Sequence, residues 1–291
     1  MNLCDYNTLR ALLARHGFHF SKTMGQNFLT DPQVPADIAD ASGAGPGWGV
    51  LEIGPGAGCL TAELARRAER VAAVELDRKL LPVLAEALTE CPNVTVVPGD
   101  ALRLDLAALA AEQFPGLRCM VCANLPYNIT TPVLTRLVET ACFQRVTVLL
   151  QKEVAHRLAA EPGSSEGGAF SLWLQYFMET EALFDVPAEK FLPRPKVDSA
   201  VLRCVRRERP AVAVEDEGWF FRVVRGAFLL RRKTLANSLG QALPECSREA
   251  IRESIAACGL PEGVRGERLT LADFAALAAR LGAVRGKEAE A

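Results

Sequence analysis

A glycine-rich turn and two acidic residues are spaced along the first half of the chain as an adenosine-binding site requires. The turn Gly54-Pro-Gly56-Ala-Gly58 follows a short apolar run. Glycines permit a tight bend there, and a helix beginning after the turn would offer free N–H groups to a ligand. Glu75 lies 21 residues beyond Gly54, where a carboxylate can accept both ribose hydroxyls. Asp100 follows the next apolar run and could accept from an adenine amino group.

Two cofactors fit an adenosine held in this way, a dinucleotide and S-adenosylmethionine. The dinucleotide fingerprint G-x-G-x-x-G is not met, because residue 59 is cysteine and the glycine spacing is G-x-G-x-G. Glu52 precedes the first glycine by two residues, close to where a pyrophosphate would lie. A cationic sulfonium and an amino group tolerate this acid better. The turn therefore favours S-adenosylmethionine as the ligand. The alternative is that the turn binds no ligand and only allows the helix to pack on the strand.

The second group with chemical potential is Asn124-Leu125-Pro126-Tyr127, which follows another apolar run. Ligands of open parallel sheets bind beyond the carboxyl ends of the strands, so we expect this group to face the same crevice as the glycine turn. An adenine amine is a poor nucleophile because its lone pair is delocalised. The Asn124 amide oxygen and a backbone carbonyl, both accepting from that amine, would favour a pyramidal nitrogen.

The rest of this tetrapeptide also suits an amine substrate. Pro126 lacks a competing N–H and stiffens the turn, and Tyr127 offers a face on which a base can stack. The pattern predicts methyl transfer to an amine, governed by positioning and electrostatics rather than by a strong base. A β-to-α loop with a helix cap is the alternative interpretation.

Four motifs together give the chain a resemblance to the ribosomal RNA adenine dimethylase family, and within it to the small-subunit (KsgA/RsmA) type. They are Gly25-Gln-Asn-Phe-Leu29, Leu51-Glu-Ile-Gly-Pro-Gly-Ala-Gly58, Asn124-Leu-Pro-Tyr127 and Phe191-Leu-Pro-Arg-Pro-Lys-Val-Asp-Ser199. They occur in the family's order, and the resemblance runs from about Thr23 to Leu281. It implies an S-adenosylmethionine-dependent enzyme that transfers two methyl groups to N6 of each of two adjacent adenosines. These adenosines lie in the 3′-terminal hairpin of 16S rRNA within an immature 30S subunit.

The resemblance also implies roles for individual residues. The cofactor contacts would be Asn27, Leu29, Gly54, Gly56, Glu75, Asp100 and Asn124. Asn124, Leu125 and Tyr127 would hold the target base, and Phe191 would cover its other face, sandwiching it against Tyr127. A base held in this way has left its stack.

The elements that must position these residues alternate along the first half of the chain. Strands are predicted at 49–54, 70–76, 94–97, 119–123 and 146–150, with helices at 58–68, 79–88, 102–111 and 132–141. This alternation indicates an α/β fold with a Rossmann-like, doubly wound, mostly parallel sheet, which the resemblance identifies as that of a class I methyltransferase.

The pattern changes after residue 150. A helix at 170–177 and strands at 184–186 and 200–205 precede four helices at 218–230, 232–242, 248–257 and 271–281. We therefore expect a methyltransferase domain at 1–205 and a small, all-helical rRNA-binding domain at 206–291.

Composition and charge narrow the class of protein. With 49% hydrophobic and 23% charged residues in 291, the chain is globular rather than disordered or fibrous, and it shows no secretory signal or membrane span. Nine scattered cysteines indicate reduced thiols and a cytoplasmic location. Cys119 and Cys122 have metal-ligand spacing, but in a strand residues three apart point to opposite faces, so no metal is expected. We expect a monomer.

One stretch of the helical part is strongly basic. Residues 204–291 hold 15 Lys and Arg against 12 Asp and Glu, although the whole chain has a net charge of −2. The stretch 222–233 contains no acidic residue and holds five cations, Arg222, Arg225, Arg231, Arg232 and Lys233. Such a run can bind rRNA phosphates, the interpretation that we favour, or form a solvated helix face.

Three other functions compete with the main hypothesis. One is an rRNA-binding assembly factor for which methylation is secondary. Another is a 23S rRNA adenine N6-methyltransferase of the resistance type, which shares the N-terminal motifs. The third, an NAD-dependent dehydrogenase, lacks a candidate histidine or lysine for hydride transfer.

Overall fold

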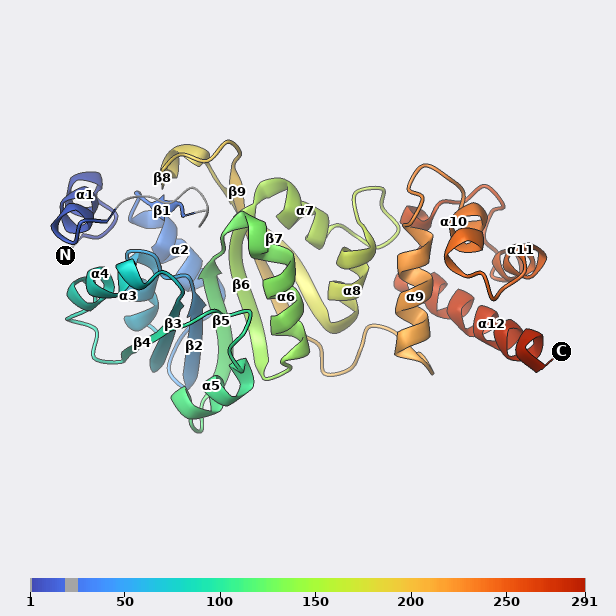
Figure 1. Cartoon of the computed structure of the whole chain (residues 1–291), viewed down its shortest axis with the longest axis horizontal. Coiled ribbons are helices and arrows are strands. Elements are labelled where there is room, and N and C mark those ends of the chain that lie inside the picture. The colour runs from blue at the N-terminus through green and yellow to red at the C-terminus, as the bar shows by residue number, and fades with distance from the viewer. Residues whose placement is uncertain (1, 19–25, 291) are drawn as a thin grey trace. The chain divides into compact units, whose positions relative to one another are not determined.

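A computed structural model of the chain, which describes residues 2–18 and 26–290, forms two compact units (Figure 1). The first joins Met1–His156 to Glu179–Arg206, and the second joins Arg157–Met178 to Arg207–Ala291. The chain passes from the first unit to the second for the last time after residue 206, where the boundary was expected. Residues 157–178, however, lie in the second unit, whereas the sequence pattern placed them in the first.

The first unit is built around a seven-stranded sheet with the order β4-β3-β2-β5-β6-β9-β7. Its strands are β2 (Trp48–Ile53), β3 (Arg70–Glu75), β4 (Val94–Pro98), β5 (Arg118–Asn124), β6 (Phe143–Gln151), β7 (Met178–Val186) and β9 (Ser199–Arg206). Neighbours from β4 to β6 pair in parallel, and β9 pairs antiparallel with β6. The predicted mostly parallel sheet is confirmed. Strand order along the sheet reverses at β2, which lies between β3 and β5, and such switch points are where ligands bind.

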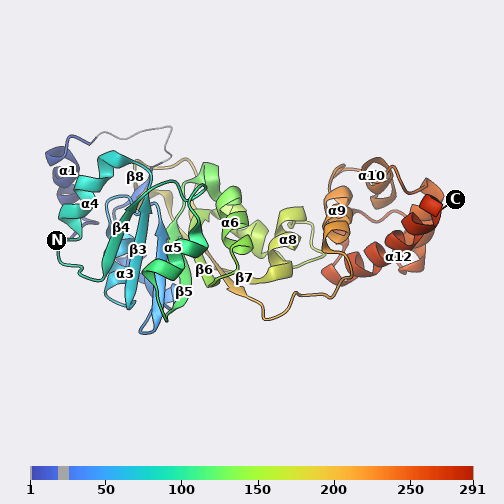
Figure 2. The same cartoon turned by 60° about the horizontal axis from the view of Figure 1, so that its bottom comes forward.

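Helices cover both faces of this sheet because its central strands are apolar on both sides (Figure 2). On one face, α2 (Gln33–Ser42) and α3 (Cys59–Ala65) share a core with Val50, Met120 and Val201. The other face carries α5 (Leu106–Gln113) and α6 (Thr130–Glu139). A Cβ on Gly49 would lie only 2.3 Å from the ring of Phe114, which follows α5.

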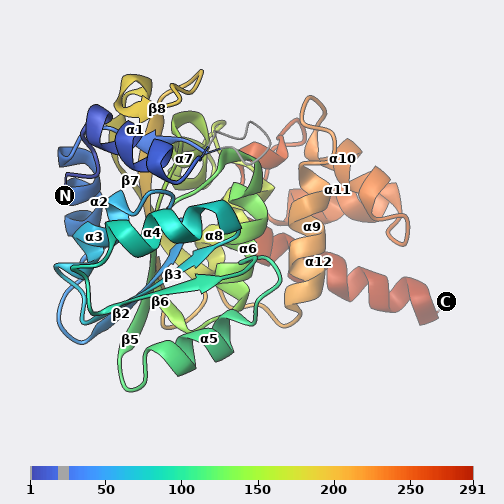
Figure 3. The ribbon, with the colours of Figure 1, turned by 60° about the vertical axis from the view of Figure 1, so that its left-hand side comes forward.

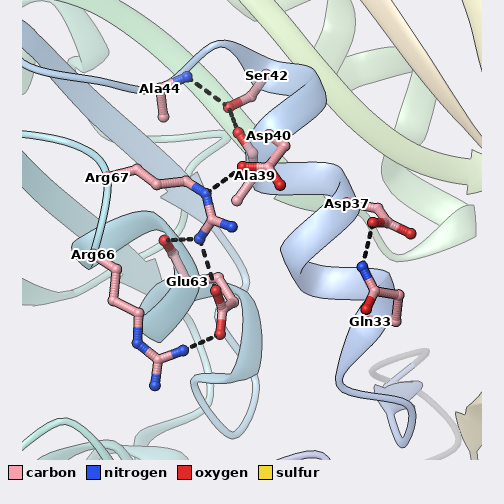
Figure 4. A network of polar contacts seen from close by, with 9 residues as sticks. All are labelled: Gln33, Asp37, Ala39, Asp40, Ser42, Ala44, Glu63, Arg66 and Arg67. Carbon is pink, nitrogen blue, oxygen red and sulfur yellow. Dashed lines mark hydrogen bonds and ion pairs between the residues drawn. The ribbon is translucent and has the colours of Figure 1, made fainter.

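Polar contacts fix α3, the helix that begins after the glycine turn, to α2 (Figure 4). Arg67, just beyond α3, donates to Asp40 at 2.6 Å and to Glu63 at 2.7 Å. At the end of α2, the Ser42 hydroxyl donates to the Ala39 carbonyl at 2.6 Å and accepts from the Ala44 N–H. The Arg67 contacts hold α3, and with it the turn, against α2, whereas the Ser42 contacts are local to the end of α2.

Three helices are present that the sequence did not predict. They are α1 (Tyr6–Arg15), α2 and α7 (Lys152–Ala159). In α1, Leu9 and Leu12 pack in one core cluster with Val83 and Leu84 of α4 (Leu81–Ala87), and the two helices lie together in Figure 3. The apolar pattern of α1 is weak because only three of its ten residues are buried.

A separate two-stranded ladder joins the first and last of the four motifs. Strand β1 (Phe28–Leu29) pairs antiparallel with β8 (Phe191–Leu192), with Leu29 opposite Phe191. The Thr30 N–H donates to the Lys190 carbonyl at 2.9 Å, and the Lys190 ammonium lies 2.6 Å from the Asp31 carboxylate. Two distant stretches of sequence thus meet beside the sheet.

The second unit consists of helices, as predicted. They are α8 (Ala169–Phe177), α9 (Glu217–Ala227), α10 (Leu235–Ala242), α11 (Arg248–Ala257) and α12 (Leu271–Glu290). Leu172 and Tyr176 of α8 belong to the same buried cluster as Phe220 and Phe221 of α9, and the Tyr176 hydroxyl donates to Glu217 at 3.0 Å. This apolar contact explains why residues 157–178 lie with the helical unit.

Side-chain caps set the limits of these helices. The Thr234 hydroxyl accepts from the Asn237 N–H, so α10 begins at Leu235 rather than at 232. Thr270 caps α12, because its hydroxyl accepts from the Asp273 N–H and the Asp273 carboxylate accepts from the Thr270 N–H in return. No helix in the described ranges is long and apolar enough to cross a membrane.

Candidate active site

A cavity of about 280 Å³ lies at the carboxyl ends of β2, β3 and β5, next to the reversal in strand order. The residues predicted to contact a cofactor line this single cavity. They are Asn27, Leu29, Gly54, Gly56, Glu75, Asp100 and Asn124. Leu125 also lines it, whereas Gly25, the first residue of the N-terminal motif, lies outside the described residues.

The glycine turn has the backbone that its sequence requires. Gly54 and Gly56 have φ values of 70° and 59°, in the left-handed region that favours glycine. A Cβ on Gly56 would also lie 2.9 Å from the Phe28 ring. The Gly54 N–H donates to the Val74 carbonyl at 2.9 Å, which ties the turn to the end of β3.

Glu75 ends β3 with its carboxylate held by the backbone. Its Oε1 accepts from the Asp77 N–H at 2.7 Å. Burial raises the pKa of Glu75, and backbone hydrogen bonds from Asp77 and Gly56 oppose this shift. The Gly99 N–H donates to the Glu75 carbonyl, which brings Asp100 to the same edge. Asp100 accepts from the Leu102 N–H at 2.9 Å.

Glu52 is the most deeply buried charged group of the cavity, with 1% of its surface exposed. Burial raises its pKa to about 8. Its Oε2 has no hydrogen-bond partner among the described residues. Leaving one oxygen of a buried carboxyl group without a partner is costly, and a cationic ligand beside the group would stabilise its ionised form.

Asn124 is oriented by the N-terminal motif. Its side-chain Nδ2 donates to the Asn27 carbonyl at 3.0 Å. One of the two N–H groups of the amide is used in this bond, which orients the amide, and Oδ1 is its acceptor. The Leu125 N–H donates to the Leu149 carbonyl of β6 at 3.1 Å, so the backbone after β5 is fixed as well.

Tyr127 and Phe191 do not line this cavity. Tyr127 begins a short 3-10 helix, Tyr127–Ile129, and its hydroxyl lies 2.7 Å from the Ser199 hydroxyl. Phe191 is buried in the β1–β8 ladder. The sandwiching of a base between these two rings stays a prediction.

Several apolar residues of the cavity wall were not predicted from the sequence. The most exposed is Leu76, which is 54% exposed and directly follows Glu75. An exposed leucine beside a carboxylate that is predicted to bind ribose would suit an apolar ring face. Its position, one residue beyond the predicted strand-end acid, is the signal that could have identified it.

The basic run lies on and after α9 in the helical unit. All five of its cations are exposed. Arg222, however, pairs with Glu245 at 2.6 Å, an acid 23 residues further along the chain. The other four, Arg225, Arg231, Arg232 and Lys233, have no ion pair within the described residues.

Comparison with known proteins gives a consistent result. The family model "Ribosomal RNA adenine dimethylase" matches residues 17–275. A protein of Geobacillus thermodenitrificans named "Ribosomal RNA small subunit methyltransferase A" is 46% identical over 272 residues, covering 92% of this chain and 93% of its own. A protein of the same name from Streptococcus pneumoniae is 45% identical over 282 residues, covering 96% of this chain and 97% of its own.

Solved structures are similar over most of the chain. The crystal structure of the 23S rRNA methyltransferase ErmE has a TM-score of 0.70 and 28% identity, covering 88% of this chain and 99% of that one. A dimethyladenosine transferase from Plasmodium falciparum also has a TM-score of 0.70, with 23% identity and coverage of 89% and 98%. The second likeness shows the fold alone.

Proposed function

Because the chain belongs to the ribosomal RNA adenine dimethylase family, we propose that it methylates N6 of two adjacent adenosines in the 3′-terminal hairpin of 16S rRNA. Each adenosine receives two methyl groups, and S-adenosylmethionine is the methyl donor. The substrate is an immature 30S subunit. The observation that carries this proposal is the meeting of the N-terminal motif, the glycine turn and Asn124 around one cavity.

The residues present fit S-adenosylmethionine better than a dinucleotide. The buried carboxyl group of Glu52 offers a pyrophosphate no positive charge, and ionising it beside that group would be unfavourable, whereas an ionised Glu52 favours the ammonium and sulfonium charges of S-adenosylmethionine. Glu75 would accept the ribose hydroxyls, and Asp100 the adenine amino group. When bound, this cofactor supplies a methyl group on a positively charged sulfur.

The chain's own residues would activate the target amine. Asn124 Oδ1 and the Leu125 carbonyl accept from the two N–H groups of the adenine amine, which directs the nitrogen lone pair away from the ring plane. The Asn27 carbonyl holds the Asn124 amide in the orientation that this requires. No strong base is needed, because the gain comes from positioning and from acceptors fixed before the reaction.

The small-subunit substrate is favoured over a 23S substrate by the degree of similarity. The relatives named for the small subunit are 45–46% identical, whereas the 23S rRNA methyltransferase is 28% identical. The exposed cations Arg225, Arg231, Arg232 and Lys233 of the helical unit would contact rRNA phosphates.

Mass spectrometry of rRNA fragments tests this function, because it reports the subunit, position and number of methyl groups together. Immature 30S particles from an undimethylated strain, incubated with the protein and S-adenosylmethionine, should gain two dimethyladenosines at the 3′-terminal hairpin. Methylation of 23S rRNA instead, or no methylation by a protein that binds the cofactor, would contradict the proposal.

Asn124→Ala separates catalysis from binding to the subunit. We expect this variant to lose methyl transfer by about 100-fold or more, as other preorganised hydrogen-bonding groups do, and to retain affinity for the 30S particle. A variant that loses binding as well would favour a primary role in subunit assembly.

A further inference from the structure

One polar contact beside the active site has no part in the function derived so far. The hydroxyl groups of Tyr127 and Ser199 lie 2.7 Å apart, a normal length for a strong O–H···O hydrogen bond. Ser199 is 0% exposed, while Tyr127 is only partly buried. A buried partner thus holds the outer end of a side chain that is itself partly exposed.

The position of Ser199 is set by the backbone around it. It begins β9 and lies opposite Gln151 in the antiparallel ladder with β6. The preceding residue, Asp198, accepts from the Ala188 N–H through its side chain at 2.9 Å and from the Lys152 N–H through its carbonyl at 3.0 Å. These contacts fix the backbone from which the Ser199 hydroxyl extends.

Tyr127 has fewer constraints of its own. It follows Pro126 at the start of a 3-10 helix of three residues, and it lies outside the cavity in which Asn124 is held. Rotation about the Cα–Cβ bond of Tyr127 would swing the whole ring and its hydroxyl to another place. A hydrogen bond at the hydroxyl prevents that rotation, and it therefore fixes where the ring lies.

We propose that Ser199 is a positioning residue, which holds the Tyr127 ring at the place where the target adenine stacks. This inference rests on the proposed function, because it needs a base at Tyr127. It also gives a chemical role to the last residue of the Phe191–Ser199 motif, which otherwise contributes only to the resemblance to the family. Ser199 itself touches neither the base nor the cofactor.

A double-mutant cycle with Ser199→Ala and Tyr127→Phe tests the proposal, measured as kcat and KM for methylation of immature 30S particles. Each single change should lower kcat roughly three- to ten-fold, the effect of losing one hydrogen bond. The double variant should be no slower than the slower single variant, because both changes remove the same bond. Ser199→Thr, which keeps the hydroxyl, should restore most of the rate.

Affinity for S-adenosylmethionine should stay at the wild-type value in all these variants, since neither residue lines the cavity. Ser42→Ala provides the matched control: Ser42 is also a buried serine with a hydrogen bond, but it lies at the end of α2. This control should lower thermal stability without changing kcat. If Ser199→Ala does not fold, the proposal is tested by the kcat values of Tyr127→Phe and Ser199→Thr.

Two results would overturn the inference. One is a Ser199→Ala variant with wild-type kcat, and the other is a double variant whose loss equals the product of the two single losses. Wild-type protein that methylates no adenosine would instead overturn the proposed function, and the inference with it. The two failures are therefore distinguishable in one assay.

Discussion

At the scale of single residues, two carboxyl groups in the cavity link ligand binding to pH. Burial raises the pKa of both Glu52 and Glu75, that of Glu52 to about 8. At neutral pH Glu52 therefore holds a proton in the free protein. A cationic ligand interacts better with the ionised carboxylate, so its binding expels that proton.

Affinity for S-adenosylmethionine should consequently rise with pH up to about 8, by at most about tenfold per pH unit, as expected for release of one proton. Glu52→Gln should weaken binding at pH 8.5 and flatten this rise. Calorimetric titration between pH 6 and 9, in buffers of different ionisation enthalpy, measures both the affinity and the released proton. Parallel pH profiles for the variant and the wild type would contradict the assignment to Glu52.

Most individual site residues could be predicted from the sequence because they follow strand ends. Gly54, Glu75, Asp100 and Asn124 each follow or end an apolar run, and parallel strands bring such positions to one edge. The partner of Tyr127 could not be predicted, since Ser199 is 72 residues away and reaches it only through the pairing of β9 with β6.

At the scale of elements, the glycine turn between β2 and α3 depends on close approach to β1. Gly56 has a positive φ, and the ring of Phe28 occupies the place where a Cβ would extend. Any side chain at Gly56 must therefore displace β1 or distort the turn, and both elements line the cavity.

Gly56→Ala should weaken binding of S-adenosylmethionine by about tenfold or more, because a left-handed non-glycine residue alone costs roughly 1–2 kcal/mol and the clash adds to it. Gly45→Ala is the control, since a Cβ at Gly45 would have open space within 4 Å and its φ is ordinary. Dissociation constants and melting temperatures of the two variants check this. Equal affinities of the two variants would contradict this prediction, because they would show that β1 can move aside at little cost.

Strands that form long apolar runs could be predicted from the sequence, and very short strands could not. The five parallel strands are apolar runs between helices, and all five are present, although β6 begins three residues earlier, at Phe143. Strands β1 and β8 have two residues each, too few for any periodicity. Their pairing is tertiary, and so it could not be read from either segment alone.

At the scale of the whole molecule, the charge on the helical unit is distributed unevenly among the cations of the basic run. Arg222 is neutralised by Glu245, whereas Arg231, Arg232 and Lys233 are exposed in the segment that joins α9 to α10. Exposed cations without an acidic partner are the ones available to phosphates.

Replacing Arg231, Arg232 and Lys233 together by alanine should weaken binding to 30S particles. It should also reduce the salt dependence of the affinity, by a slope of about one for each phosphate that the variant no longer binds. Arg222→Ala should have a smaller effect because its charge is already paired. Binding measured between about 50 and 200 mM salt, a range over which phosphate contacts have a large effect, tests this. An unchanged slope in the triple variant would identify the run as a solvated surface.

A protein ending at residue 206 should be poorly soluble, because it retains α8 without the helix that covers it. Leu172 and Tyr176 are buried against the cluster that contains Phe220 and Phe221, and truncation exposes their apolar surface to water. A truncated chain that also lacks 157–178, with a short linker from 156 to 179, should be more soluble. Sedimentation and dye binding would compare the two, and equal behaviour would contradict the role given to α8.

The division of the helical unit between two segments also affects the order of events during translation. Helix α8 leaves the ribosome about 40 residues before α9, a separation that follows from their bounds at Phe177 and Glu217. In that interval the strands β7 and β9 can complete the sheet, while the aromatic side chains of α8 are not yet covered by α9. During synthesis the nascent chain therefore exposes an apolar surface on α8 that is covered only when α9 has been made.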